Sequence, residues 1–248
     1  MNKPKSRLER LIVIPAVVLL AFIIPRSATA VTSLVWPLVS AIDPEKVFLW
    51  LSIHHVLALA FTVLVMKFVF KMDFRQWGFN LNQLKESLRI IGWFARVWLV
   101  VIMLTLLPNI FSGTAPSFDY PLTATNMAGV LGFQILLTGT AEEPLFRGML
   151  MTILGKYFTG MHRIGNFEIP SSGVIAAILF TLAHIGFTFS PFAITHFSLF
   201  QLVGAFVLGF FFASVFHRTG SLLGPIIMHG YGNGILFVGR YSVAFLFG

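Results

Sequence analysis

Seven apolar runs, each close to the length of a membrane-spanning helix, dominate this sequence. They fall near residues 11–25, 47–70, 90–110, 125–152, 172–190, 196–216 and 222–238. A helix needs about 20 residues to cross about 30 Å of hydrocarbon, and a chain inside lipid must satisfy its backbone hydrogen bonds internally. The runs therefore predict an all-α fold, a polytopic membrane bundle of about 7–8 transmembrane helices.

Composition supports a membrane protein and excludes several other classes. Hydrophobic residues make up 57% of the chain and charged residues only 10%, whereas a soluble domain carries about 25% charged residues. The formal net charge is +8, but the basic residues lie at the ends of apolar runs, so we expect contacts with lipid headgroups and no nucleic-acid partner. The chain has no cysteine, which excludes disulfides, zinc–thiolate sites and thiol nucleophiles.

The distribution of basic residues predicts the orientation in the membrane. They precede the first run and follow the second, fourth and sixth runs, as Lys3, Lys5, Arg7, Arg10, Lys71, Arg75, Lys85, Arg89, Lys156, Arg163 and Arg218. The positive-inside rule then places every basic linker and the N-terminus in the cytoplasm, provided that residues 27–42 are peripheral or re-entrant rather than an additional span. We expect an integral, multi-pass protein of the cell membrane.

Two further segments have a recognisable pattern. Residues 1–30 resemble a signal peptide, but a polytopic chain needs no separate export signal, so we expect an uncleaved first helix. Apolar residues recur at helical spacing between charges over 74–88, which predicts an amphipathic helix at the cytoplasmic surface. These residues are Phe74, Trp77, Leu81, Leu84 and Leu88.

Two adjacent carboxylates, Glu142 and Glu143, lie inside the fourth apolar run. A charged side chain inside the membrane costs free energy, so each of these glutamates is a candidate functional residue. On a helix Glu143 and Arg147 are four residues apart and share a face, which predicts an ion pair. Glu142 is rotated by about 100° and is left without that partner. Since one carboxylate suffices to neutralise Arg147, we expect the second to act as a general acid or base.

Two later spans carry histidines at a similar depth. Glu142, His184 and His229 lie roughly 20, 18 and 11 Å from the cytoplasmic ends of their runs at 1.5 Å per residue, and His229 shares a helix face with Asn233. These side chains supply a carboxylate, two imidazoles and an amide at one place inside the bilayer. Such a group indicates a site at which a water molecule reacts. The remaining histidines are interpreted as core or span-end residues: His54, His55, His162, His196 and His217.

Three motifs on three spans together resemble one known family. They are Glu142-Glu143-x-x-x-Arg147, Phe180-x-x-x-His184 and His229-x-x-x-Asn233. In order and spacing they are similar to the CAAX protease and bacteriocin-processing family (CPBP, or Abi), which includes the Rce1-type prenyl-protein endopeptidases. The resemblance covers about residues 125–240 as a catalytic core, with 1–124 as N-terminal transmembrane helices and the amphipathic segment, in one integrated membrane domain.

The resemblance implies a glutamic intramembrane protease, a hydrolase that cleaves a peptide bond of a membrane-associated protein, with CAAX-type prenylated proteins among the candidate substrates. It makes Glu142 the general base, with His184 positioning the same water. It assigns His229 and Asn233 to the oxyanion hole, where each donor is worth about 3 kcal/mol in other hydrolases.

The resemblance gives Glu143 and Arg147 a supporting role, in which they orient Glu142. It implies no metal and no other cofactor, although two histidines and a carboxylate make a plausible zinc ligand set. The expected partners are a protein or peptide substrate at the membrane and the lipid bilayer itself.

Two other function classes remain open. The chain could be a non-catalytic bacteriocin-immunity or membrane scaffold protein that retains the fold, but such a protein would not need all four of Glu142, His184, His229 and Asn233. It could instead be a small transporter with Glu142 and His184 as a proton relay, but the sequence shows no repeated halves.

Overall fold

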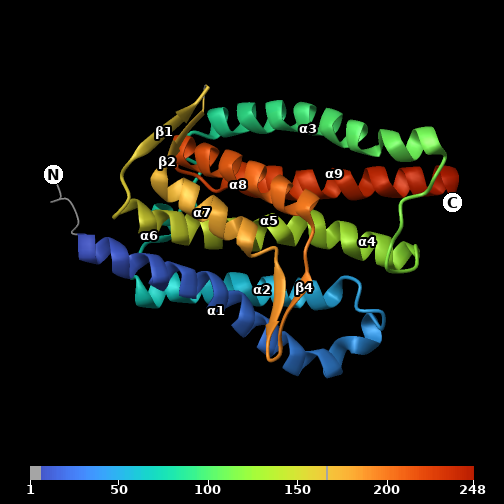
Figure 1. Cartoon of the computed structure of the whole chain (residues 1–248), viewed down its shortest axis with the longest axis horizontal. Helices are drawn as coiled ribbons and strands as arrows, with labels where there is room; N and C mark the ends of the chain where they lie inside the picture. Colours follow the sequence, from blue (N-terminus) through green and yellow to red (C-terminus); the bar gives the residue numbers. More distant parts are fainter. Residues whose placement is uncertain (1–6, 166) are drawn as a thin grey trace.

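The computed structural model describes residues 7–165 and 167–248, most of them in helices that run roughly along one axis of the molecule (Figure 1). The predicted all-α membrane bundle is confirmed. Within the described residues, four helices are long and apolar enough to cross a membrane: Leu8–Ile42, Leu49–Val69, Leu84–Ser112 and Leu199–Thr219. Lys3 and Lys5, part of the predicted cytoplasmic N-terminus, lie outside the described residues.

The first helix, α1, is longer than predicted. It runs without a break over Arg7–Val39 and ends in a single 3₁₀ turn, η1 (Ser40–Ile42). Residues 27–39 are therefore not an additional span, as predicted, but the re-entrant form is wrong, because this stretch of small and apolar residues continues the first helix through Pro37. Their peripheral position stays a prediction. A helix of this length measures about 50 Å and must tilt in, or project from, about 30 Å of hydrocarbon.

The next elements are α2 (Leu49–Leu64), η2 (Val65–Val69), η3 (Phe74–Trp77) and α3 (Leu84–Ser112). The predicted amphipathic helix over 74–88 is wrong. The 3₁₀ turn η3 ends at Gly78, whose φ of 91° is left-handed, a conformation that glycine adopts at no steric cost. Trp77 is fully buried, so this apolar side chain packs into the protein and not onto its surface.

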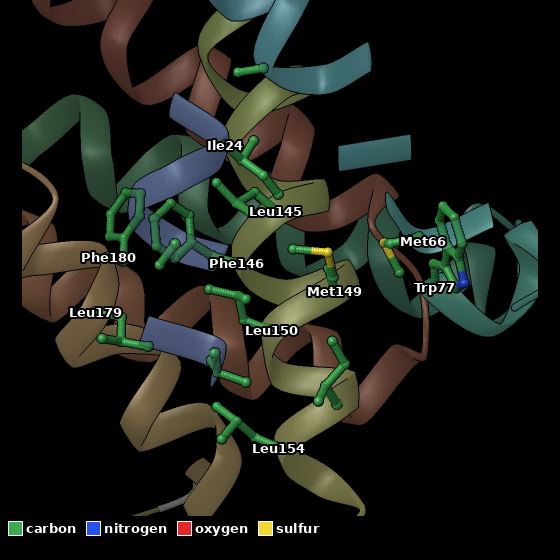
Figure 2. Packing of buried hydrophobic residues seen from close by; sticks show 14 of the residues in the cluster. Ile24, Met66, Trp77, Leu145, Phe146, Met149, Leu150, Leu154, Leu179 and Phe180 are labelled. Carbon is green, nitrogen blue, oxygen red and sulfur yellow. The ribbon is translucent and has the colours of Figure 1, made fainter. Parts of the chain in front are cut away.

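The fourth apolar run forms one continuous helical rod. Its parts are α4 (Ala124–Gly132), η4 (Phe133–Thr138), α5 (Gly139–Glu143), η5 (Pro144–Met151) and α6 (Thr152–Gly155), of which η4 and η5 are π-helical. All eight residues of η5 are buried. Figure 2 shows Leu145, Phe146, Met149 and Leu150 of this rod packed among side chains of α1, η2 and α7. The rod is thus the centre of the core.

The remainder of the chain alternates helices with two antiparallel hairpins that the sequence analysis did not predict. The hairpins are β1–β2 (Met161–Ile164 and Phe167–Pro170) and β3–β4 (Gly186–Phe189 and Phe192–His196), and the helices are α7 (Ser171–Leu182), α8 (Leu199–Thr219) and α9 (Leu223–Phe247). The fifth apolar run therefore ends as a helix at Leu182. In Figure 1 the hairpin β3–β4 leaves the bundle across its long axis toward α1, where Phe187 contacts Phe22.

Glycines let α9 lie directly against the central rod. A Cβ atom on Gly230 would lie 2.2 Å from the carbonyl oxygen of Ile135, and one on Gly139 would lie 2.5 Å from that of Ile226. Small residues at a helix contact allow such close approach of two backbones in a membrane bundle. This approach places His229 of α9 beside the two glutamates of α5.

Candidate active site

A buried ion pair forms the base of the site. Nη1 of Arg147 donates to Oε1 of Glu143 over 3.1 Å, and neither side chain is exposed to solvent. The predicted pairing of these two residues is confirmed. Nη2 of Arg147 also donates to the carbonyl oxygen of Gly209 over 3.0 Å, and its guanidinium lies 4.5 Å from the centre of the Phe180 ring. Arg147 therefore ties the rod to both α7 and α8.

His229 is held by the same buried carboxylate. Its Nδ1 lies 2.8 Å from Oε1 of Glu143, and its ring packs near the rings of Phe180 and Phe212. An ionised carboxylate can only accept hydrogen bonds, so Nδ1 carries a proton and donates it to Glu143. The other ring nitrogen, Nε2, then faces Glu142 at 3.8 Å from Oε2.

Glu142 has a partner that the sequence analysis missed. Oε1 of Glu142 lies 3.2 Å from Nε2 of His55 in α2, 87 positions earlier in the chain. The prediction that Glu142 lacks a partner is wrong, because helical spacing reports only contacts within one helix, whereas α2 packs against α5. Oε2 of Glu142 is buried and has no hydrogen-bond partner among the described residues.

His184 lies just beyond the end of α7, on the margin of this cluster. Its Nδ1 lies 2.8 Å from the carbonyl oxygen of Phe180. A carbonyl can only accept, so Nδ1 carries the proton, and in the neutral ring Nε2 keeps its lone pair. The imidazole is close enough to Glu142 to interact with it electrostatically.

Asn233 is one helical turn beyond His229, as its spacing predicts. Its Nδ2 donates to Oγ1 of Thr138 over 3.2 Å, and Thr138 lies one turn before Glu142 on the rod. The amide therefore contacts the helix that carries the glutamates, while its hydrogen bond goes to a hydroxyl and not to a carboxylate.

The structure thus brings four predicted residues into direct contact or near contact: Glu142, Glu143, Arg147 and His229. It places His184 and Asn233 at the edge of this group and adds His55, which was interpreted as a core histidine. One signal could have singled out His55. Adjacent imidazoles at 54 and 55 inside an apolar span are as unusual as the two adjacent glutamates, and a polar residue at that depth seeks a partner.

The charges in the cluster do not balance without the imidazoles. Two carboxylates, of Glu142 and Glu143, face the single guanidinium of Arg147. Protonation of one imidazole would make the cluster neutral. Because a buried net charge is expensive, the cluster favours a state with one imidazolium.

A metal site was the alternative that the sequence analysis left open. Among residues 7–165 and 167–248, no group of three or more histidine, aspartate or glutamate side chains is placed to hold a metal ion. The expectation that the reaction needs no metal or other cofactor stays a prediction.

Comparison with known proteins adds a family match. Residues 124–235 match the family model of the Rce1-like type II CAAX prenyl endopeptidases. The matched segment contains all six site residues predicted from the sequence, and it excludes His55. Searches of curated proteins and of solved structures gave no match.

Proposed function

We propose that this chain, whose residues 124–235 match the Rce1-like family of type II CAAX prenyl endopeptidases, is a member of that family and cleaves a peptide bond with a water molecule activated by Glu142. The observation that carries the proposal is the state of the Glu142 carboxylate. One oxygen is held by His55, and the other is buried without a hydrogen-bond partner among the described residues, 3.8 Å from Nε2 of His229.

The unpartnered oxygen of Glu142 is the proposed base. It takes a proton from water as the water oxygen attacks the carbonyl carbon of the scissile peptide, and it later returns that proton to the leaving amine. Nε2 of His184, whose other nitrogen is committed to Phe180, accepts the second hydrogen bond of the same water. Two acceptors then orient one nucleophile.

His229 and Asn233 are the proposed donors to the oxyanion. Because Nδ1 of His229 donates to Glu143, Nε2 can donate only when the ring is an imidazolium. The negative charge of Glu143 stabilises that cation, and Arg147 in turn holds Glu143 in place. Preorganised donors of this kind lower the barrier by about 3 kcal/mol each.

The substrate we propose is a protein segment at the membrane, of which CAAX-type prenylated proteins are one class. The four long apolar helices and the family both indicate an integral membrane protein. We further propose that its N-terminus and the 155–170 segment face the cytoplasm, as the basic residues predict. Cysteine introduced at position 160 tests this cleanly, since the native chain has no cysteine. Labelling of that position only from the outside would invert the orientation.

The decisive experiment compares the N- and C-terminal peptides of membrane proteins in cells that carry the wild-type chain or Glu142→Gln. We expect termini that are present with wild type and absent with the variant. Glu168→Gln is the matched control, because Glu168 is an exposed carboxylate on β2 and its loss should leave the termini unchanged. Identical termini with wild type and Glu142→Gln would refute proteolysis. Immunity or scaffolding that persists in the variant would then favour a non-catalytic role.

A further inference from the structure

We infer that His55 is a positioning residue that fixes the Glu142 carboxylate so that one defined oxygen serves as the base. The inference rests on the function proposed above. It concerns a contact that joins α2 to the rod, from a residue outside the segment that matches the family model.

The imidazole of His55 is itself fixed from two sides. Its Nδ1 lies 2.9 Å from the carbonyl oxygen of Leu51, one turn earlier on α2. The ring packs edge-on against Phe133 of η4, with the ring centres 4.8 Å apart, and only 13% of the side chain is exposed. A ring held in this way can present its remaining nitrogen in only one direction, toward Glu142.

Counting protons shows what passes between the two residues. The carbonyl of Leu51 can only accept a hydrogen bond, so Nδ1 of His55 carries a proton. The contact of 3.2 Å between Nε2 of His55 and Oε1 of Glu142 then requires one further proton. Because Glu142 must be ionised to act as a base, that proton lies on Nε2, as an imidazolium beside a carboxylate.

This arrangement makes the two oxygens of Glu142 unequal. Oε1 is occupied by His55, and Oε2 is buried without a hydrogen-bond partner among the described residues. A carboxylate tied by one oxygen cannot rotate freely, so Oε2 keeps its place beside Nε2 of His229. Loss of His55 would release the carboxylate from that orientation, and misplacement of a catalytic group by about 1 Å can cost about 100-fold in rate.

His54 offers a matched control at the next position of the same helix. Its Nδ1 lies 3.3 Å from Oγ1 of Thr29, and its ring stacks on Trp50. It is thus the same residue type in the same span, with hydrogen bonding directed to α1 and not to Glu142.

The first experiment measures peptide cleavage by the full chain in liposomes. We expect His55→Ala to lower kcat by about 10- to 100-fold with little change in KM, and His54→Ala to stay within about twofold. His55→Gln keeps an N–H donor near the position of Nε2, so we expect it to recover most of the kcat lost in the alanine variant. A purely structural role would not separate Gln from Ala in this way. Wild-type kcat in His55→Ala, or a glutamine variant no better than alanine, would overturn the inference.

The second experiment does not depend on turnover. The chain contains six glutamates, so ¹³C labelling of glutamate carboxyls gives a simple NMR spectrum of the protein in liposomes, in which Glu142 is identified by its absence in Glu142→Gln. We expect this signal to shift in His55→Ala and not in His54→Ala. If wild type cleaves peptide but the Glu142 signal is unchanged in His55→Ala, the role of His55 is refuted and the proposed function stands. A shifted signal without any cleavage by wild type refutes the proposed function and leaves His55 as the residue that holds Glu142.

Discussion

The helices before residue 113 and the segment 124–235 are built for different surroundings. In the most apolar windows of α2 and α3 only 17% of the residues are buried inside the protein, whereas every residue of η5 is buried. The first region exposes apolar side chains, which suits contact with lipid. The centre of the second region, η5, is enclosed by protein, so it can carry charged groups whose partners lie on neighbouring helices. The site therefore depends on enclosure as much as on its reactive residues.

The division between the regions is nevertheless incomplete. The contact between His55 and Glu142 crosses it, so the first region contributes to the site as well as facing the membrane.

The largest effect is expected for the carboxylate at the centre of the site. Glu142→Ala should reduce peptide cleavage by at least about 10³-fold, because loss of general base catalysis alone costs about 10²–10⁴-fold. Insertion and folding should persist, since Arg147 keeps its partner Glu143. Turnover by purified protein in liposomes measures the loss of cleavage, and a thermal melting curve in detergent shows whether the protein is still folded. Unchanged turnover would remove the central role of Glu142.

The buried ion pair should dominate stability. Arg147→Ala leaves Glu143 without its guanidinium, and removal of one partner of a buried pair costs about 3–5 kcal/mol. Glu143→Gln combined with Arg147→Met should recover much of that loss, because neither residue then carries a charge. Thermal unfolding in detergent of the single and double variants checks this. A double variant less stable than Arg147→Ala would contradict the pairing.

The amide at the edge of the site should affect rate and not binding. Asn233→Ala should lower kcat by about 10²–10³-fold with little change in KM, as expected when one oxyanion donor is removed. Steady-state kinetics with a peptide substrate separates the two parameters. If KM rises instead and kcat is preserved, Asn233 binds substrate and does not stabilise the transition state.

The smallest effect is expected for an ion pair in the first region. Arg89 donates to Glu86 over 3.1 Å at the start of α3, but its side chain is 80% exposed. Arg89→Ala should therefore change stability by less than about 1 kcal/mol. Comparison of Arg89→Ala with Arg147→Ala tests whether burial determines how much an ion pair contributes to stability. Equal losses in the two variants would show that it does not.

Local geometry explains which features could be predicted. The pair of Glu143 and Arg147 follows from four-residue spacing on one helix, and the structure contains it. The partner of Glu142 could not be found in this way, because His55 lies 87 positions away on another span. Helix spacing describes one face of one helix, while contacts between spans depend on how the helices pack.

The departures in secondary structure have a similar origin. The basic residues predict that residues 27–42 are peripheral or re-entrant, yet the first helix continues through them to Val39. Conversely, the apolar run 172–190 stops being helical at Leu182 and continues as the strand β3, because a short apolar run does not by itself distinguish a helix from a strand. An apolar run therefore does not fix the backbone conformation within it.

The low apolarity of the rod has a consequence for how the protein is made. Within the described residues, the segment that carries Glu142, Glu143 and Arg147 is not among the four helices that are long and apolar enough to cross a membrane. A single acidic or basic residue at the centre of a helix raises the cost of insertion by about 2.5–3.5 kcal/mol, so this segment is a poor substrate for the insertion machinery by itself. Synthesis delivers α1, α2 and α3 first. We therefore expect the rod to insert into a bilayer in which these helices are already present, where His55 of α2 can pair with Glu142.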